Sequence, residues 1–316
     1  ITLRNLLIIK ELIMPVTAYP FDIDALTDHR KRTRRELIND GSKRIKKKIA
    51  VLGGSTTNDF IKTLEVFLLS EGIEPEFYES EYNRFWQDAM FENPELADFS
   101  PDIIYIHTSY RNIASFLPET TDTVEEIDSK LNERFSYYEK MWIRLASVYS
   151  CPIIQNNFEL PPYRLFGNRD CYDIHGAVNF ITRLNLRFAE YAQQNQGFYI
   201  CDINYIASCF GLDKWFDDQA WYMYKYACSL DAVPYVTKNL SNIIKSIFGK
   251  NKKVLALDLD NTLWGGVVGD DGVEGIEIGE ETATSECFKG FQECRYSLIN
   301  VVGGCQVRIP VRYQHG

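Results

Sequence analysis

Two carboxylates follow a short apolar run late in the chain, in the sequence Val254-Leu-Ala-Leu-Asp258-Leu-Asp260-Asn-Thr262. Their spacing suits a division of labour, because one carboxylate can attack a phosphorus atom while the other gives a proton to the leaving oxygen. A divalent cation would offset the negative charge gathered there, and Mg²⁺ prefers such oxygen ligands. The pair therefore predicts phosphoryl chemistry, although an Asp-x-Asp after a strand can also cap a helix or form a turn.

A serine near the start of the chain is a second candidate nucleophile. The run Ile49-Ala-Val-Leu-Gly-Gly-Ser55-Thr-Thr57 reads as a strand, a tight turn and the start of a helix. Ser55 could attack an ester while backbone N–H groups receive the oxyanion, or it could only cap the helix, as Thr57 could. His107 at a strand end could supply a base and Asn157 after a later strand an oxyanion donor, but both could equally be structural polar groups.

These residues need a framework of buried strands that alternate with helices. Apolar runs predict strands at 49–52, 74–78, 102–108, 152–155 and 197–202. Helical patterns occupy 58–70, 131–149 and 177–192. Such alternation predicts an α/β fold of three layers, αβα, with a mostly parallel sheet and with ligands at the carboxyl ends of the strands. Ser55, His107 and Asn157 would then lie at one edge of the sheet.

The pattern divides the chain into a basic helical lead-in (1–46), an α/β domain (47–250) and a second unit (251–316) that begins after the Gly249-Lys-Asn turn. The lead-in contains an expected helix at 23–39. Between Arg30 and Lys48 ten basic residues face two acids, whereas the whole chain has 34 basic and 44 acidic residues and a net charge of −10. The basic run is either a solvated helix or a docking site for an acidic partner. The overall charge argues against nucleic-acid binding.

The composition points to a protein of the cytoplasm. Of the 316 residues 45% are hydrophobic, which suffices for two packed domains. The eight cysteines form no CxxC pair and no zinc-ligand spacing, so we expect reduced, mostly buried thiols. The apolar stretch at 1–15 is interrupted by charges and has neither a spanning length nor a cleavage site. We therefore expect no contact with a membrane.

The segment around the carboxylates resembles a known family. An apolar strand followed by DxDxT is similar to motif I of the haloacid dehalogenase superfamily, and the longer run from Asp258 to Gly272 resembles its FkbH-like branch, subfamily IIIC. The resemblance implies the beginning of a Rossmann-like catalytic domain in which Asp258 is phosphorylated, Asp260 is the general acid/base and Thr262 holds the loop. It also implies a Mg²⁺ ion on the Asp258 carboxylate and the Asp260 carbonyl, and a flap at 264–279 that excludes water.

Family membership would imply a phosphorylated small-molecule substrate. Some FkbH-like proteins load a glyceryl unit onto an acyl carrier protein and others are known only as phosphatases, and the sequence leaves both open. The later motifs of the family, a Ser or Thr at a strand end, a Lys and a late acidic pair, have no counterpart in 280–316. We therefore expect a truncated or frame-shifted catalytic domain, doubtful from 295 to 316, with weak or no phosphatase activity.

The first domain resembles another group of enzymes. The run that contains Ser55 is similar to block I of SGNH-type hydrolases, and FkbH-like proteins carry such an SGNH-like, flavodoxin-like region ahead of the phosphatase domain. An SGNH hydrolase should also have a late Asp-x-x-His, yet Asp217 is followed by Asp-Gln-Ala and His315 is the only histidine after His175. Three functions remain: the phosphatase or transferase, a non-catalytic module that binds a ligand or a carrier protein, and an esterase that uses Ser55.

Overall fold

The computed structural model describes residue 17 and residues 23–251 and 257–301 of the chain. It forms two compact units, residues 1–250 and residues 251–316, each of which is described by itself. The expected strand at 254–257 lies almost wholly outside the described residues, as do the first part of the lead-in and the end of the doubtful tail.

Unit 1 is built on a five-stranded sheet in the order β2-β1-β3-β4-β5. The strands are β1 (Ile45–Gly53), β2 (Ile73–Glu79), β3 (Ile103–His107), β4 (Ile153–Asn156) and β5 (Phe198–Cys201). All neighbouring strands run parallel, so their carboxyl ends share one edge of the sheet. The predicted parallel sheet is confirmed. Strand β1 begins four residues earlier than its apolar run, because Ile45 and the lysines after it pair with β2.

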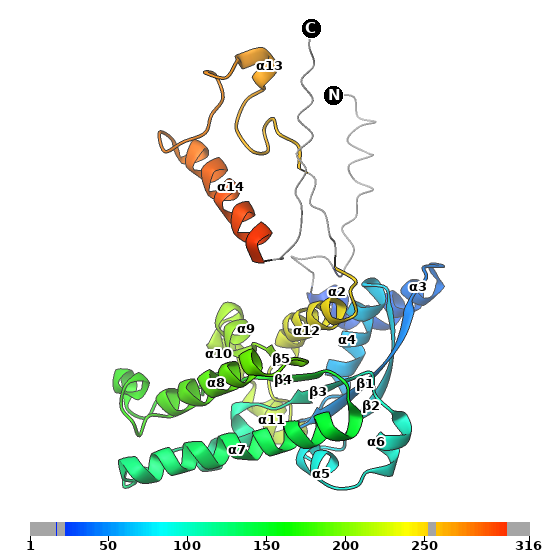
Figure 1. Cartoon of the computed structure of the whole chain (residues 1–316), viewed down its shortest axis with the longest axis vertical. Helices are drawn as coiled ribbons and strands as arrows, with labels where there is room; N and C mark the ends of the chain where they lie inside the picture. Colours follow the sequence, from blue (N-terminus) through cyan, green and yellow to red (C-terminus); the bar gives the residue numbers. More distant parts are fainter. Residues whose placement is uncertain (1–16, 18–22, 252–256, 302–316) are drawn as a thin grey trace. The chain divides into compact units, whose positions relative to one another are not determined.

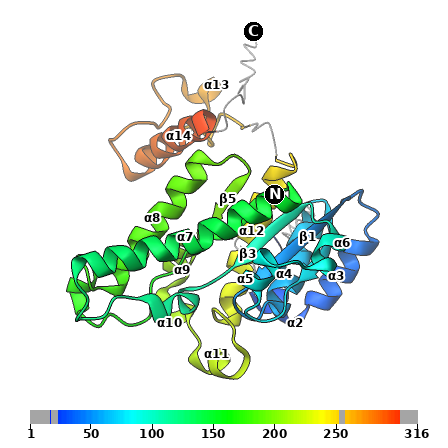
Figure 2. The ribbon, with the colours of Figure 1, turned by 60° about the horizontal axis from the view of Figure 1, so that its bottom comes forward.

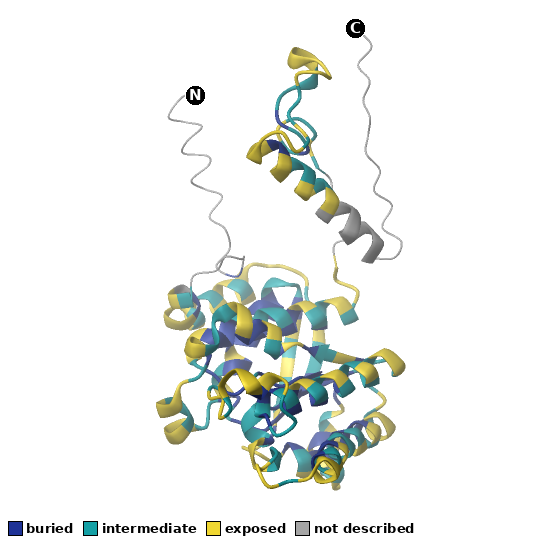
Figure 3. Ribbon diagram, turned by 90° about the vertical axis from the view of Figure 1, so that its left-hand side faces the viewer, coloured by how far each residue is buried: buried dark blue, intermediate teal, exposed yellow. Residues whose placement is uncertain are grey.

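Helices cover both faces of this sheet (Figure 1). One face carries α4 (Asn58–Ser70), α9 (Ile203–Phe210) and α12 (Val233–Ile247), and the other carries α5 (Phe85–Met90), α7 (Val124–Tyr149) and α8 (Ala177–Gln194). Side chains of β1 alternate between the two cores: Ile49 and Val51 pack with the first set of helices, Ala50 and Leu52 with the second. The expected αβα arrangement is therefore confirmed, with its buried residues on and beside the sheet (Figure 3).

The basic lead-in packs on helix α4. It forms two helices, α2 (Ile23–Asp28) and α3 (Arg30–Asn39), instead of the one helix expected, because the chain bends at His29. Leu26 and Leu37 contact the outer face of α4. Several side chains of the basic run between Arg30 and Lys48 form ion pairs with acids of the α/β domain. The pairs are Arg30–Asp59, Arg34–Glu65 and Lys47–Asp102. These pairs favour the structural interpretation of the basic run.

Further short helices belong to unit 1. The short helices are α6 (Pro94–Phe99), α10 (Leu212–Trp215) and α11 (Asp218–Tyr224), and α11 with its flanking loops extends beyond the body of the unit (Figure 2).

The described cysteines carry free thiols, but the expectation that most are buried is wrong: Cys171, Cys209 and, in unit 2, Cys287 are exposed.

Unit 2 contains a loop region followed by one long helix. Its described helices are α13 (Val268–Asp271) and α14 (Ala283–Val301). A β-bridge joins Gly265 to Glu277 and closes the intervening loop. Leu263 is buried, and the side chain of Gln292 on α14 donates to its carbonyl at 2.6 Å. In neither unit does a described helix combine the length and apolarity needed to cross a membrane.

Candidate functional site

The order of the strands makes the carboxyl ends of β1 and β3 the switch point of the sheet. The connections from these two neighbours leave toward opposite faces of the sheet, which separates the loops at this point and makes it the usual ligand site of such folds. The two loops are fastened by Asn112, whose Nδ2 donates to the carbonyl of Gly54 at 2.9 Å. A Cβ at position 54 would lie 2.6 Å from that side chain, so only glycine permits this approach.

Ser55 follows β1 at this switch point and is closed off from solvent. Its side chain is 1% exposed and its Oγ has no hydrogen-bond partner within the described structure. The next residue is bonded to the end of α11: the N–H of Thr56 donates to the carbonyl of Lys225 at 3.0 Å and the Thr56 hydroxyl donates to the carbonyl of Tyr224 at 2.6 Å. An ester could reach Ser55 only if the groups that bury it moved.

His107 adjoins the same turn through its backbone, but its side chain turns into the core. The Gly54 N–H donates to the His107 carbonyl at 2.7 Å. The ring lies 4.8 Å from that of Phe60, and its Nδ1 is 3.0 Å from the hydroxyl of Tyr105. Burial lowers the pKa of His107 to about 4, so the imidazole is neutral at pH 7. No hydrogen bond links it to Ser55, and its role as a base stays a prediction.

Asn157 serves as a connector between β4 and α9. Its Nδ2 donates to Asp202 at 2.7 Å, and its Oδ1 accepts from the N–H of Asn204 at 3.1 Å. The neighbouring Asn156 bridges β4 to β3, since its Oδ1 accepts from the N–H of Thr108 at 2.7 Å. These bonds favour the structural interpretation of Asn157, whose proposed part as an oxyanion donor stays a prediction.

Sequence reasoning missed Arg111, which follows β3. Its Nη2 donates to Asp218 of α11 at 2.9 Å, and its Nε has no partner. The guanidinium also lies 4.6 Å from the ring centre of Trp221. The available signal was a lone cation a few residues after the carboxyl end of a buried strand.

Glu159, which follows β4, was missed as well. It is fully buried, with Oε2 accepting from the N–H of Tyr110 at 3.3 Å and Oε1 unpaired. Burial raises the pKa of Glu159 to about 7. A carboxyl so placed can hold or release a proton near neutral pH, which is a property common at functional sites and also found in structural ones.

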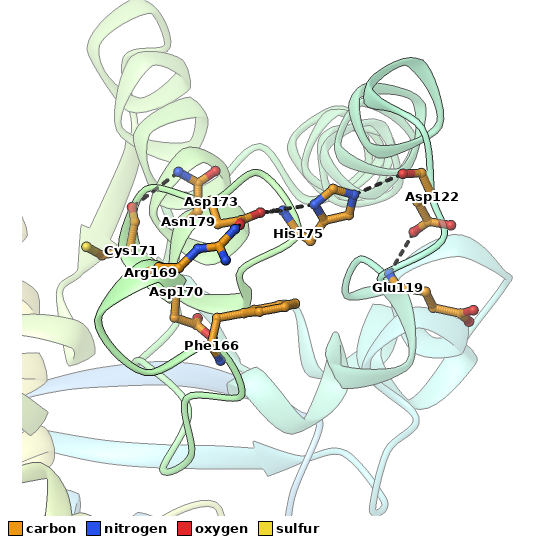
Figure 4. A network of polar contacts seen from close by, with 9 residues as sticks. All are labelled: Glu119, Asp122, Phe166, Arg169, Asp170, Cys171, Asp173, His175 and Asn179. Atoms are coloured by element: carbon orange, nitrogen blue, oxygen red, sulfur yellow. Dashed lines mark hydrogen bonds and ion pairs between the residues drawn. The ribbon is translucent and has the colours of Figure 1, made fainter.

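A second polar network lies away from this edge (Figure 4). His175 joins two loops, with Nδ1 3.0 Å from the carboxylate of Asp173 and Nε2 3.0 Å from the carbonyl of Asp122. The hydrogen bond that the ring donates to Asp173 raises the pKa of His175. The side chains drawn around it hold the start of α8, where buried Asp170 accepts from the N–H of Val178 at 2.8 Å. The network fastens loops and brings no nucleophile to the histidine.

Unit 2 contains the predicted carboxylate pair. Asp258 is exposed, and its Oδ1 accepts from the N–H of Leu259 at 2.9 Å. Oδ1 of Asp260 accepts from Nε1 of Trp264 at 3.1 Å and from the N–H of Val268 at 3.2 Å, which fixes this carboxylate against the flap. Thr262 lies in the turn, where its N–H donates to the carbonyl of Leu259 at 3.2 Å.

The donor set of this loop suits Mg²⁺. It offers carboxylate and carbonyl oxygens, and Mg²⁺ commonly takes only one or two protein carboxylates beside water and substrate phosphate. An exposed Asp258 carboxylate with a single backbone neighbour is available for such a bond. In the described part of the chain no group of three or more His, Cys, Asp or Glu side chains could hold a metal ion, so Asp258 and Asp260 would bind it without a third such residue from that part.

Solved structures resemble the chain to different degrees. It is similar to the N-terminal part of the protein BF1531 from Bacteroides fragilis, described as containing a phosphatase domain complexed with Mg, at 26% identity and a TM-score of 0.75 over 88% of this chain and 72% of that one. A GDSL-like lipase (BT0569) from Bacteroides thetaiotaomicron has 16% identity and a TM-score of 0.41 over 69% of this chain and 98% of that one, which is too low to support an argument.

A family model fits the greater part of unit 1. A comparison with curated proteins found no match. The model of the FkbH N-terminal domain, however, matches residues 48–245, which include every strand of the sheet from within β1 to β5 and most of α12. The resemblance inferred from the sequence is thereby confirmed, and the chain belongs to the FkbH family, whose N-terminal domain makes up most of its unit 1.

Proposed function

We propose that this chain belongs to a Mg²⁺-dependent phosphoryl-transfer enzyme of the haloacid dehalogenase type, in which Asp258 is the nucleophile. The observation that carries the proposal is the pair of unequal carboxylates: Asp258 is exposed, while Asp260 is held by Trp264 and Val268. The similarity to a solved protein described as containing a phosphatase domain complexed with Mg supports it.

The two aspartates divide the chemistry. An oxygen of Asp258 forms a bond to phosphorus as the bond from phosphorus to the leaving oxygen breaks, and Asp260 gives that oxygen its proton. Asp260 then takes a proton from water as the water attacks the aspartyl-phosphate, which releases phosphate and restores both groups. A Mg²⁺ ion bound at Asp258 and Asp260 would offset the charge of the phosphate.

The flap limits the access of water to this loop. The bridge between Gly265 and Glu277 closes its base. Within it, Asp271 accepts from the N–H of Val267 at 2.8 Å and so acts as a turn residue. Since Asp260 bonds to the same segment through Val268, the position of the flap and that of the general acid are coupled.

The substrate proposed is a phosphorylated small molecule. Loading of a glyceryl unit onto an acyl carrier protein is the finer alternative, and it would begin with the same loss of phosphate. The two differ in the fate of the organic group: a phosphatase releases it into solution, whereas a loading enzyme leaves it attached to the carrier protein, where mass spectrometry of the carrier detects it.

Trapping of the phosphoenzyme tests the proposal. In keeping with the weak activity expected from the sequence, we expect the chain to take up label from radiolabelled acetyl phosphate with Mg²⁺ slowly, in a form that hydroxylamine removes, and Asp258→Asn to abolish this uptake. Asp260→Asn should retain the label and lose it more slowly. Asp270→Asn, an exposed acid of the flap, is the matched control and should behave as the unaltered chain. Labelling that persists in Asp258→Asn, or that never occurs, would contradict the proposal.

For unit 1 we favour a ligand-binding role over an esterase. The Ser55 hydroxyl has no base in hydrogen-bond contact, and the nearby His107 is bonded to Tyr105. An esterase would require ester cleavage that is lost in Ser55→Ala and retained in Asp258→Asn. Absence of such cleavage, with a measurable ligand affinity, is the result that we expect.

A further inference from the structure

The loop after β3 encloses a cation that the phosphoryl chemistry does not use. The side chain of Arg111 is 12% exposed and lies among three aromatic rings, those of Trp221, Tyr110 and Phe216, at 4.6, 5.4 and 5.8 Å. Its one hydrogen bond goes to Asp218, and its Nε is buried without a partner. The guanidinium therefore has an unsatisfied hydrogen-bond donor, Nε–H, at a position that is largely closed to water.

A second unpaired polar group belongs to the adjoining turn. Ser55 is 1% exposed and its Oγ has no partner. Only Thr56 and Thr57 lie between it and the 13-residue helix α4. The bond between Asn112 and Gly54 holds the turn beside the loop of Arg111. The first N–H groups of a helix attract anions, and buried polar atoms without partners destabilise a fold. Arg111 Nε and Ser55 Oγ are both buried without a partner, and a hydrogen bond joins the loops that carry them. A ligand that accepts or donates hydrogen bonds at both atoms would satisfy them.

Asp218 indicates the charge of that ligand. Its side chain is 51% exposed and comes from α11, a short helix on the surface of the unit. It pairs with Arg111 and also accepts from the hydroxyl of Tyr163 at 3.4 Å. The planar fork of arginine recognises carboxylate and phosphate oxygens in the same way. The carboxylate of Asp218 thus occupies the position that an anionic group of a ligand would take.

We propose that Arg111 and Ser55 form a binding site for the carboxylate or phosphate group of a small organic anion, and that α11 is a lid whose Asp218 occupies Arg111 until the anion displaces it. The aromatic rings around Arg111 would contact the apolar part of the ligand. Thr56, the neighbour of Ser55 in the chain, fastens the other end of the lid through Tyr224 and Lys225. The site lies in unit 1 and does not depend on the chemistry of Asp258.

The acids that face the site set its affinity. Asp218 competes with the ligand for the guanidinium. Glu159 is the second acid, since its carboxyl accepts from the backbone of Tyr110, next to Arg111. Burial keeps much of the Glu159 carboxyl in its neutral form near pH 7, which lessens its repulsion of an anion.

Calorimetric titration of the full chain with inorganic phosphate, and separately with acetate, tests the proposal. We expect weak binding by the unaltered chain, binding about tenfold tighter in Asp218→Asn, where the competing charge is gone, and none in Arg111→Gln. Asp217→Asn is the matched control: it removes the same charge one residue away and retains the bond to the N–H of Ala220, since Asn caps a helix as well as Asp. It should bind as the unaltered chain does.

Three results would contradict the proposal. Equal affinities in Asp217→Asn and Asp218→Asn, binding that survives Arg111→Gln, or no saturable binding in Asp218→Asn would each overturn the proposal. If Arg111→Gln fails to fold, Arg111→Lys keeps the charge without the planar fork and should bind several-fold more weakly, with equal affinity counting against the site. Binding of phosphate alone would identify a phosphorylated ligand, and tighter binding of acetate a carboxylic acid.

Discussion

The side-chain hydroxyl of Thr56 donates to the carbonyl of Tyr224 at 2.6 Å, although 168 positions separate the two residues in the chain. Together with the bond from the Thr56 N–H to Lys225, it holds the end of α11 beside the turn that contains Ser55. The lid that α11 and its flanking loop form is thus fastened at one end by Thr56 and at the other by Arg111.

Removal of the Thr56 hydroxyl should loosen this lid. We expect Thr56→Val to lower the free energy of unfolding by about 1 kcal/mol, the usual contribution of one hydrogen bond, and to increase deuterium exchange in residues 217–226. Thr27→Val is the control, because the hydroxyl of Thr27 bonds only within α2. Exchange in 217–226 that is the same in both variants would show that Thr56 does not hold the lid.

His107 and Glu159 should give opposite dependences of stability on pH. Burial lowers the pKa of His107 from 6.5 to about 4 and raises that of Glu159 from 4.5 to about 7. Neutral Glu159 stabilises the fold fully below its unfolded pKa, and this contribution is lost as the pH rises to about 7. Neutral His107 stabilises it above its own unfolded pKa, and this contribution is lost as the pH falls to about 4. From about pH 4.5 to 6.5 the two slopes, each about 1.4 kcal/mol per pH unit, oppose one another.

Substitution of either residue should reveal the slope of the other. In Glu159→Gln we expect the free energy of unfolding to fall as the pH decreases from about 6.5 to about 4.5, and in His107→Asn to rise over the same interval. Urea unfolding at a series of pH values measures both. A slope that is unchanged by Glu159→Gln would mean that the Glu159 carboxyl titrates normally in the folded chain.

His175 should titrate above its ordinary pKa and His107 below it. Both ring nitrogens of His175 face acceptors, Asp173 and the carbonyl of Asp122, and only the protonated ring can donate to both. The stabilisation from His175 is therefore present below its unfolded pKa and lost as the pH rises through the folded value. NMR titration of the histidine ring protons gives the two pKa values. Asp173→Asn should lower that of His175, and an unchanged value would contradict the assignment.

Asp260 should hold the flap in a way that Asp258 does not. Its carboxylate accepts from Trp264 and from the N–H of Val268, so Asp260→Ala removes both bonds. We expect faster deuterium exchange in residues 264–271 of this variant. Asp258→Ala is the matched control, because Asp258 bonds only to the neighbouring N–H of Leu259 among the described residues. Equal exchange in the two variants would show that the Asp260 carboxylate does not hold the flap in place.

The cysteines should differ in reactivity toward iodoacetamide. Burial raises the pKa of Cys201 to about 12 and also raises that of Cys228, so both thiols should stay unmodified in the folded chain. The exposed Cys171 and Cys209 should react within the same time. Peptide mass spectrometry measures each site, and early modification of Cys201 would indicate that the sheet opens at β5.

Much of the sheet could be predicted because each strand is a local apolar run. The interval 103–107, for example, is buried at every position and needs no knowledge of the rest of the chain. The start of β1 could not be predicted, since Ile45 and the following lysines become a strand only through pairing with Ile73 and its successors. The bend at His29 was missed for a similar reason: the packing of Leu26 and Leu37 on α4 fixes it, not a local signal.

The sequence by itself determined the parallel α/β sheet, the family and the carboxylate pair, because each depends on residues that are neighbours in the chain. The tertiary structure decided the arrangement at the carboxyl ends of β1 and β3: Ser55 is buried, His107 turns toward Tyr105, and Arg111 pairs with Asp218. These relationships join loops from different strand ends with a helix more than a hundred residues later. Their energy comes from burial and hydrogen bonds that exist only once the sheet has brought those loops to one edge.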